Sequence, residues 1–302
     1  MSEYHNPVLL DESVTALLGD NASGIYADAT FGGGGHTREI LSRLNNAGRV
    51  LAFDRDSDAL KNKPDDGRLV LIHNNFRFIH NYVLYEGYDE GIDGILADLG
   101  VSSHQFDTAE RGFSFRFDAP LDMRMNREAK KTAADIVNGY TEEELARILW
   151  LYGEVDGSRK MASLICSARQ KAAIATTAEL SKAIESMLPK FAEHKVLAKV
   201  FQALRIEVNE EMKSLEKFLG GAALSLKKGG RLVVITYHSL EDRMVKNFIK
   251  CGNVEGNVVK DIYGNVNAPL EALIKKPIIP SEEEISGNTR ARSAKLRVAV
   301  KR

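Results

Sequence analysis

The chain has 302 residues, which allows one large domain or two of ordinary size. Hydrophobic residues make up 44% and charged residues 27%, as in soluble globular proteins. The net charge of −1 excludes a protein that holds nucleic acid by overall charge, so any RNA contact must come from local patches. Cys166 and Cys251 lack metal-ligand spacing, and no signal peptide or membrane span is evident. We expect a cytoplasmic protein without a metal or a membrane partner.

Four short apolar segments, each followed by a turn and a helical pattern, predict parallel strands. They are residues 25–30, 49–54, 69–72 and 92–98. Their nearly continuous apolar character is typical of strands buried on both faces. Ile40, Leu41 and Leu44 share one helical face between the first two segments, as in a β-α-β unit. The sequence therefore predicts an α/β fold with a Rossmann-like sheet that binds ligands at the carboxyl ends of its strands.

The strand pattern is interrupted by a long helical segment. Residues 141–144 and 176–179 read as capping boxes, and a helical stripe runs from Phe201 to Leu215. A strand pattern returns at residues 229–238, and residues 270–279 and 295–300 predict a final antiparallel hairpin. We therefore expect a discontinuous sheet domain at 1–104 and 216–302. Residues 105–215 form a helical insertion, for which we expect substrate recognition.

Four consecutive glycines, residues 32–35, follow the first strand. Such a turn allows close approach of a ligand and presents backbone N–H groups to an anion at the helix start. Asp54, at the end of the second strand, lies where a ribose diol would bind. These features alone fit S-adenosylmethionine (SAM) or NAD. Two observations favour SAM: Thr37 replaces the third glycine of a dinucleotide motif, and Asp28 would repel a pyrophosphate but can face the positive end of SAM.

Three further residues are candidates for chemistry at the strand ends. Asp98 ends the fourth strand, where a carboxylate can accept an N–H of an exocyclic amine, or can contact the cofactor. His36 either shapes the cofactor loop or caps a helix. His238 follows the fifth strand and is a tentative catalytic residue, for which a proton relay, base positioning and a purely structural role all stay open.

Two arginine-containing segments are candidates for RNA contact. The first, just after the fourth strand, contains Arg111, Phe113, Phe115 and Arg124, a mixture suited to stacked bases and phosphates. Its alternative is a loop anchored by buried phenylalanines. The second is the basic segment 286–302 with Arg290 and Arg292, whose alternative is a solvated, charge-protected edge strand.

In its ordered motifs the chain resembles the ribosomal RNA small subunit methyltransferase H family, also called MraW. The resemblance covers nearly the whole chain. The matching residues are 5–12, 28–36, 53–56, 73–76, 97–103 with Gln105, 111–115, 120–125, 201–206 with 208–209, 238–243 and 290–297. A string of motifs in this order is far more specific than a glycine loop.

The resemblance implies a SAM-dependent enzyme that methylates the exocyclic N4 of one cytidine in the decoding region of 16S rRNA, within the assembled small ribosomal subunit. By this resemblance the cofactor residues are Gly34, Gly35, His36, Asp54, Phe76, Asp98 and Gln105. Phe76 would pack on the adenine and Asp54 would bind the ribose. A monomer and a homodimer both stay open.

The chain departs from the family pattern at Lys195–Leu197, at Lys199, at Val155 and at Thr236-Tyr237, where the family usually has Ser-Phe. We expect these positions to lie away from the cofactor residues and to affect substrate contacts only. Two rival functions are a non-catalytic ribosome assembly factor with a vestigial SAM pocket and an NAD-dependent oxidoreductase.

Overall fold

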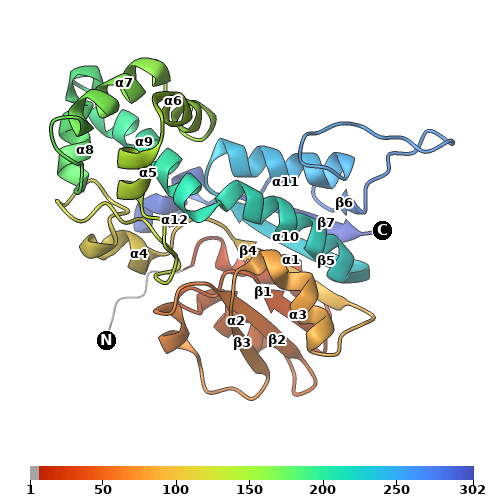
Figure 1. The fold of residues 1–302 in the computed structure, drawn as a ribbon. Coiled ribbons are helices and arrows are strands. Elements are labelled where there is room, and N and C mark those ends of the chain that lie inside the picture. The colour runs from red at the N-terminus through yellow and green to blue at the C-terminus, as the bar shows by residue number, and fades with distance from the viewer. Residues whose placement is uncertain (1–6) are drawn as a thin grey trace. The chain divides into compact units, whose positions relative to one another are not determined.

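A computed structural model describes residues 7–302, so His5 and Asn6 of the first motif lie outside the described residues. The described chain divides into two compact units, which are treated separately below. Unit 1 comprises the chain up to Gly100 together with Met212–Arg302, and unit 2 is Val101–Glu211. In Figure 1 the chain of unit 2 runs from yellow to green.

Unit 1 is built on one seven-stranded sheet with the strand order β3-β2-β1-β4-β5-β7-β6 (Figure 1). The strands are β1 (Ile25–Asp28), β2 (Arg49–Asp54), β3 (Leu69–His73), β4 (Ile92–Asp98), β5 (Leu226–Thr236), β6 (Leu270–Ala272) and β7 (Lys295–Lys301). Strands β1 to β5 pair in parallel, and β7 is antiparallel to both neighbours. The predicted Rossmann-like, mostly parallel sheet is thus confirmed. From β1 the chain builds outward to β3 and then returns to β4 on the other side of β1. This places a topological switch point, where open α/β sheets bind ligands, between β1 and β4.

Both faces of the sheet are covered by helices. The helices and short 3₁₀ turns of this unit are α1 (Leu10–Leu18), α2 (Gly35–Arg43), η1 (Ala59–Asn62), η2 (Phe76–Phe78), α3 (Ile79–Tyr85), α10 (Glu211–Ser225, in this unit from Met212), α11 (Ser239–Cys251), α12 (Glu282–Gly287) and η5 (Thr289–Ser293). Side chains of α3, α10 and α11 join one apolar core, and side chains of α1 and α2 join another. Successive β4 residues Ile95 and Leu96 enter opposite cores, which explains the continuous apolar strands.

The C-terminal strands pair as predicted, but they do not form a tight hairpin. Strand β6 ends at Ala272, and within the rest of the predicted segment pairing with β7 returns only at the isolated bridge between Ile278 and Leu296. The polar connection contains α12 and η5 instead of a loop. Strand β7 then lies between β5 and β6, so its residues pair on both sides.

Unit 2 is helical and has its own apolar core. Its elements are α4 (Ser103–Asp107), η3 (Ala109–Arg111), α5 (Ala133–Gly139), α6 (Glu142–Leu151), α7 (Ser158–Arg169), α8 (Thr177–Ala183), η4 (Glu185–Met187) and α9 (Glu193–Asn209). The predicted capping boxes of Thr141 and Thr176 are both formed. The predicted stripe from Phe201 to Leu215 is not one helix, because Glu210 adopts a left-handed conformation (φ 47°) that ends α9.

Among residues 7–302, no helix combines the length and the apolar character needed to span a bilayer.

Candidate active site

The glycine turn joins β1 to α2. Gly34 is the N-cap of α2 with φ 77°, a left-handed conformation that favours glycine. Gly35 is the first residue of the helix, and a Cβ there would lie 2.1 Å from Cγ of Pro7. The two glycines are therefore required, one by its backbone angle and the other by the close approach of Pro7.

Asp28 stabilises this turn through two hydrogen bonds. One carboxylate oxygen accepts the Thr37 hydroxyl at 2.6 Å and the other accepts the backbone N–H of Thr30 at 3.0 Å. The side chain is fully buried. Asp28 therefore holds the loop in shape. Each of its oxygens keeps a further acceptor position, so a role facing the positive end of SAM stays a prediction.

Asp54 ties the end of β2 to the same turn. Its Oδ2 accepts the N–H of Gly32 and its Oδ1 accepts the N–H of Asp56, both at 2.8 Å. Burial raises the pKa of Asp54 to about 6, although these two hydrogen bonds oppose the shift. A carboxylate offers about four acceptor positions, so about two remain for a ligand. That number matches the two hydroxyls of a ribose diol.

Asp98 lies where the ends of β1, β4 and β5 meet. Its backbone N–H donates to Oγ1 of Thr30 at 2.7 Å, and its Oδ1 accepts the Tyr237 hydroxyl at 2.7 Å. Nδ1 of His36 is 3.8 Å from its Oδ2. Burial, with Asp28 and Glu241 adding to it, raises the pKa of Asp98 to about 6 against the effects of His36 and Tyr237. The carboxyl group is thus held in place and lies at the switch point of the sheet.

His36 is buried in the first turn of α2. Its Nε2 is 3.3 Å from the carbonyl oxygen of Val8, and its other ring nitrogen faces Asp98. The imidazole therefore connects the glycine turn, the segment before α1 and the end of β4.

Tyr237 was not predicted as a site residue. The departure from the family pattern at this position was expected to lie away from the cofactor residues, and that expectation is wrong, because the hydroxyl of Tyr237 donates to Asp98. Burial and the neighbouring carboxylates raise the pKa of Tyr237 well above its ordinary value, so the phenol keeps its proton. The sequence offered one indication of this contact. Tyr237 directly follows β5, so it lies at the same edge of the sheet as Asp98.

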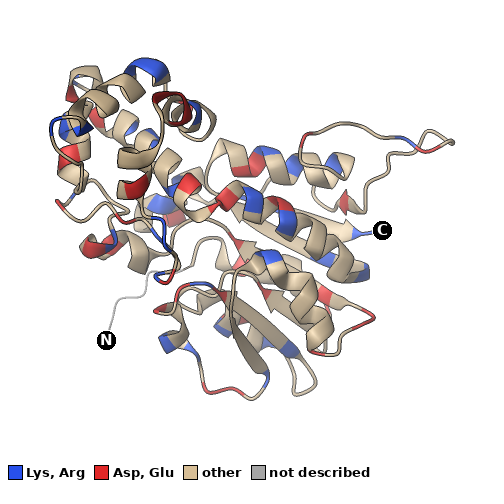
Figure 2. Cartoon of the chain, viewed as in Figure 1, with Lys and Arg blue, Asp and Glu red and all other residues tan. Residues whose placement is uncertain are grey.

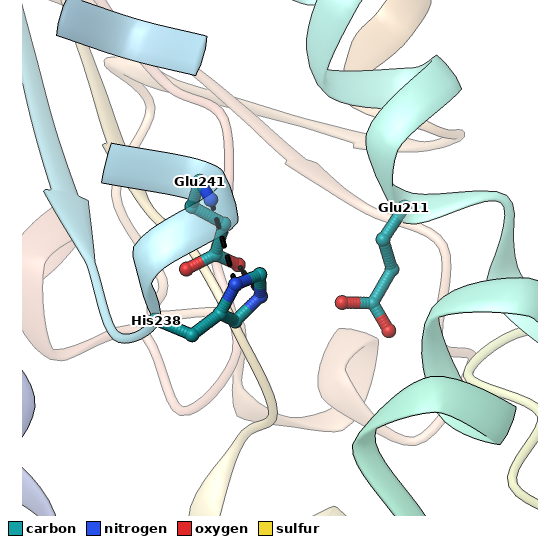
Figure 3. A group of neighbouring side chains, drawn as sticks. All are labelled: Glu211, His238 and Glu241. Atoms are coloured by element: carbon teal, nitrogen blue, oxygen red, sulfur yellow. Dashed lines mark hydrogen bonds and ion pairs between the residues drawn. The ribbon is translucent and has the colours of Figure 1, made fainter. Parts of the chain in front are cut away.

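His238 is the N-cap of α11 (Figure 3). Its Nδ1 accepts the backbone N–H of Glu241 at 3.4 Å, and its Nε2 lies 3.1 Å from Oε1 of the same residue. The other oxygen of Glu241 accepts the N–H of Tyr237 at 2.9 Å. His238 and Glu241 therefore fix the turn that presents Tyr237.

The last two predicted cofactor residues lie in different units. Phe76, in η2 directly after β3, packs edge-on against Phe218 with 5.1 Å between ring centroids and stays partly exposed. It can therefore offer a ring face to an adenine. Gln105 belongs to unit 2, where it is buried and forms a reciprocal capping box with Ser102.

Two of the predicted RNA contacts are buried in unit 2. The guanidinium group of Arg111 donates to the carbonyl oxygens of Arg124 and Met125, and the residue is 4% exposed. Phe113 is part of the apolar core. The prediction of direct RNA contact is corrected for both, because the loop is anchored by buried side chains, which was the alternative.

The other residues predicted to contact RNA differ in exposure and in their contacts within the chain. Phe115 is partly buried and packs against Phe201 and His194, and Arg124 donates to both carboxylate oxygens of Asp122. Arg290 is half-buried and Arg292 is exposed in η5. In the same basic segment Arg297 pairs with Asp242 through two hydrogen bonds. Figure 2 shows acidic and basic residues interspersed, without an extended basic face in that view.

The chain is similar to proteins of one family over its whole length. The sequence pattern of the MraW methylase family matches residues 2–302. A Bacteroides fragilis (strain YCH46) protein named ribosomal RNA small subunit methyltransferase H is 56% identical over 99% of this chain and 98% of its own length. Proteins of the same name from Phocaeicola vulgatus and Christiangramia forsetii are 55% and 51% identical, each over 98% or more of both chains. The similarity therefore includes both units.

Proposed function

The chain belongs to the MraW methylase family, and from this premise we propose that it is a SAM-dependent methyltransferase acting on the exocyclic N4 of a cytidine in 16S rRNA. The observation that carries the proposal is the fixed carboxyl group of Asp98 at the switch point, beside the glycine turn and Asp54. The names of the relatives support an RNA substrate.

The residues of unit 1 fit SAM. Gly34 and Gly35 open the start of α2, where backbone N–H groups favour the methionine carboxylate. Asp54 has acceptor positions left for the ribose diol, and Phe76 would pack on the adenine. Gln105 is the one predicted cofactor residue that belongs to unit 2.

The chemistry requires an amine whose lone pair points at the methyl group. When bound, SAM supplies a methyl group on a positively charged sulfur. The carboxylate of Asp98 accepts one N–H of the cytidine amine, which orients the lone pair and stabilises the positive charge that develops on the nitrogen. Tyr237 and His36 keep this carboxylate in place. His238 acts as a positioning residue, because both of its ring nitrogens face Glu241.

The proposal extends to the biological setting. The target cytidine leaves its stack, at a cost of a few kcal/mol, to reach Asp98. Unit 2 recognises the substrate, which is 16S rRNA in the assembled small subunit, and the enzyme acts in the cytoplasm.

The decisive experiment incubates assembled small subunits that lack the modification with the protein and SAM, and then measures nucleoside masses. We expect a gain of one methyl group on one cytosine. No gain, with an active positive control, would refute the proposal. Calorimetry with SAM and with NAD tests the oxidoreductase alternative. If Asp98→Ala kept the cellular role, the non-catalytic assembly factor would be favoured.

The pKa of Asp54 predicts that SAM affinity depends on pH. The ionised carboxylate accepts the diol hydroxyls, so affinity should be full above pH 7 and fall through pH 6, by about tenfold at pH 5. The folding stability of the ligand-free protein depends on pH in the opposite sense. Because the pKa of Asp54 is higher in the folded than in the unfolded state, ionisation of this group makes the protein less stable as pH rises from about 4 to 6. Calorimetric titration with SAM at several pH values measures the predicted change in affinity. Because Asp54 and Asp98 both have a raised pKa, the variants Asp54→Asn and Asp98→Asn show which carboxyl group causes the pH dependence of SAM affinity. An unchanged pH profile in Asp54→Asn would contradict its assignment to Asp54.

A further inference from the structure

One surface groove of unit 2 lies between α6 and the start of α7. It has a volume of about 720 Å³, and its lining includes Glu142, Glu143, Arg147, Trp150, Ser158 and Arg159. All of these residues belong to the same unit, so the groove does not depend on unit 1. None of them was predicted as a functional residue.

Trp150 is the most unusual residue of this groove. It is the only tryptophan of the chain, and 63% of its surface is exposed. Its neighbours on the inner face of α6, Leu145, Ile148 and Leu149, are all buried in the core. An aromatic ring exposed at the wall of a groove offers a stacking face, and tryptophan is strongly enriched where proteins bind partners.

The two arginines of the groove lack partners within the described part of the chain. The side chains of Arg147 and Arg159 make no ion pair or hydrogen bond with any of residues 7–302. Other arginines of unit 2 have hydrogen-bond partners within the chain. Backbone carbonyls or carboxylates accept hydrogen bonds from Arg111, Arg124, Arg169 and Arg205. Two guanidinium groups beside one exposed aromatic ring are the combination that binds a stacked base and its phosphates.

The start of α7 adds positive charge at Arg159, in a groove whose lining otherwise balances two arginines against two glutamates. Arg159 lies in the first turn of α7, whose N-cap Gly157 provides no side-chain hydrogen bond and whose first turn contains no acidic residue. The positive end of the helix dipole therefore adds to the charges of Arg159 and Lys160. Glu142 and Glu143 on α6 have the opposite charge, but carboxylates can accept the amino groups of bases.

We propose that the groove of Arg147, Trp150 and Arg159 binds an unpaired nucleotide of single-stranded RNA, with its base stacked on Trp150 and its phosphates at the two arginines. The proposal rests on the proposed rRNA substrate and gives unit 2 a contact outside the site of methyl transfer. A basic peptide, attracted by Glu142 and Glu143, is the competing occupant that the test must exclude.

Because Trp150 is the only tryptophan of the chain, its fluorescence emission reports binding in the groove directly. The full chain is titrated with an unstructured oligocytidylate while tryptophan emission is recorded, and stacking is expected to quench that emission. In the variants, binding is followed by anisotropy of a labelled oligonucleotide. Trp150→Ala should weaken binding about tenfold. Arg147→Ala and Arg159→Ala should each reduce the slope of log affinity against log salt by about 0.7.

The matched control is Lys171→Ala, which removes one exposed positive charge beyond the other end of α7, roughly 18 Å away along the helix. It should bind RNA like the unaltered protein. Glu142→Gln combined with Glu143→Gln keeps an oxygen that can accept base amino groups but removes two negative charges. It should therefore tighten RNA binding, whereas it would weaken binding of a basic peptide.

Three outcomes would overturn the proposal: emission unchanged by RNA, arginine variants that bind as tightly as the Lys171→Ala control, or quenching by a basic peptide in place of RNA. The nucleoside assay on small subunits is run in parallel. Methylation without quenching would reject the groove alone, whereas quenching without methylation would reject the proposed function.

Discussion

Asp98→Asn is expected to lower kcat about 10²- to 10³-fold, while SAM affinity changes much less. The variant keeps the shape of the side chain and a hydrogen-bonding group for Tyr237, but it removes the charge that, in the proposed mechanism, stabilises the amine in the transition state. Single-turnover methylation of small subunits, with SAM binding measured by calorimetry, separates the two effects. Asp89→Asn, at an exposed position, is the matched control. A kcat within threefold of the control would contradict the role of Asp98.

The same experiment includes Tyr237→Phe, which introduces the residue that the family resemblance leads us to expect at this position. It leaves the Asp98 carboxylate intact and removes the hydrogen bond that lowers its pKa. We expect a loss of kcat of tenfold at most and a shift of the acidic limb of the pH profile toward higher pH. A purely structural tyrosine would lower stability and leave that limb unchanged.

Asn209→Ala is expected to destabilise unit 2 by about 2–4 kcal/mol. The side chain of Asn209 accepts the N–H of Met125 at 2.8 Å and donates to the carbonyl oxygens of Met123 and Arg205 at 2.7 and 2.8 Å. Each buried polar group left without a partner costs about 1–3 kcal/mol. Met123 also holds a left-handed conformation (φ 59°) that this hydrogen bond supports.

Denaturant unfolding of the full chain, followed by circular dichroism, measures this loss. The control is Asn46→Ala, at an exposed position in unit 1. The amide of Asn209 would be dispensable if the two variants unfolded at the same denaturant concentration.

Several parts of the site could be predicted from the sequence because their signals are local. An apolar strand ends where its polar residues begin, so Asp54 and Asp98 could be placed at strand ends without knowledge of the rest of the chain. The glycine turn was equally local, since Gly34 and Gly35 stand between a strand and an amphipathic helix.

The remaining parts depend on contacts between distant segments. Tyr237 and Asp98 are 139 positions apart, and only the pairing of β4 with β5 brings them together. The hydrogen bond from the Thr37 hydroxyl to Asp28 also joins two elements, and the local sequence around Asp28 does not indicate it. The arginines and phenylalanines after β4 form a pattern that fits both RNA contact and internal anchoring, and the tertiary acceptors of Arg111 decide between them.

The hydrogen bonds of Asn209 have a consequence for the order of folding. Strands β4 and β5 are neighbours in the sheet but are separated by all of unit 2. By joining residues 123–125 to the end of α9, Asn209 shortens the flexible path between these strands to about a third. A threefold shorter loop lowers the entropy cost of closure by about 1 kcal/mol. If unit 2 folds first, we therefore expect the side chain that stabilises the helical unit also to speed completion of the sheet.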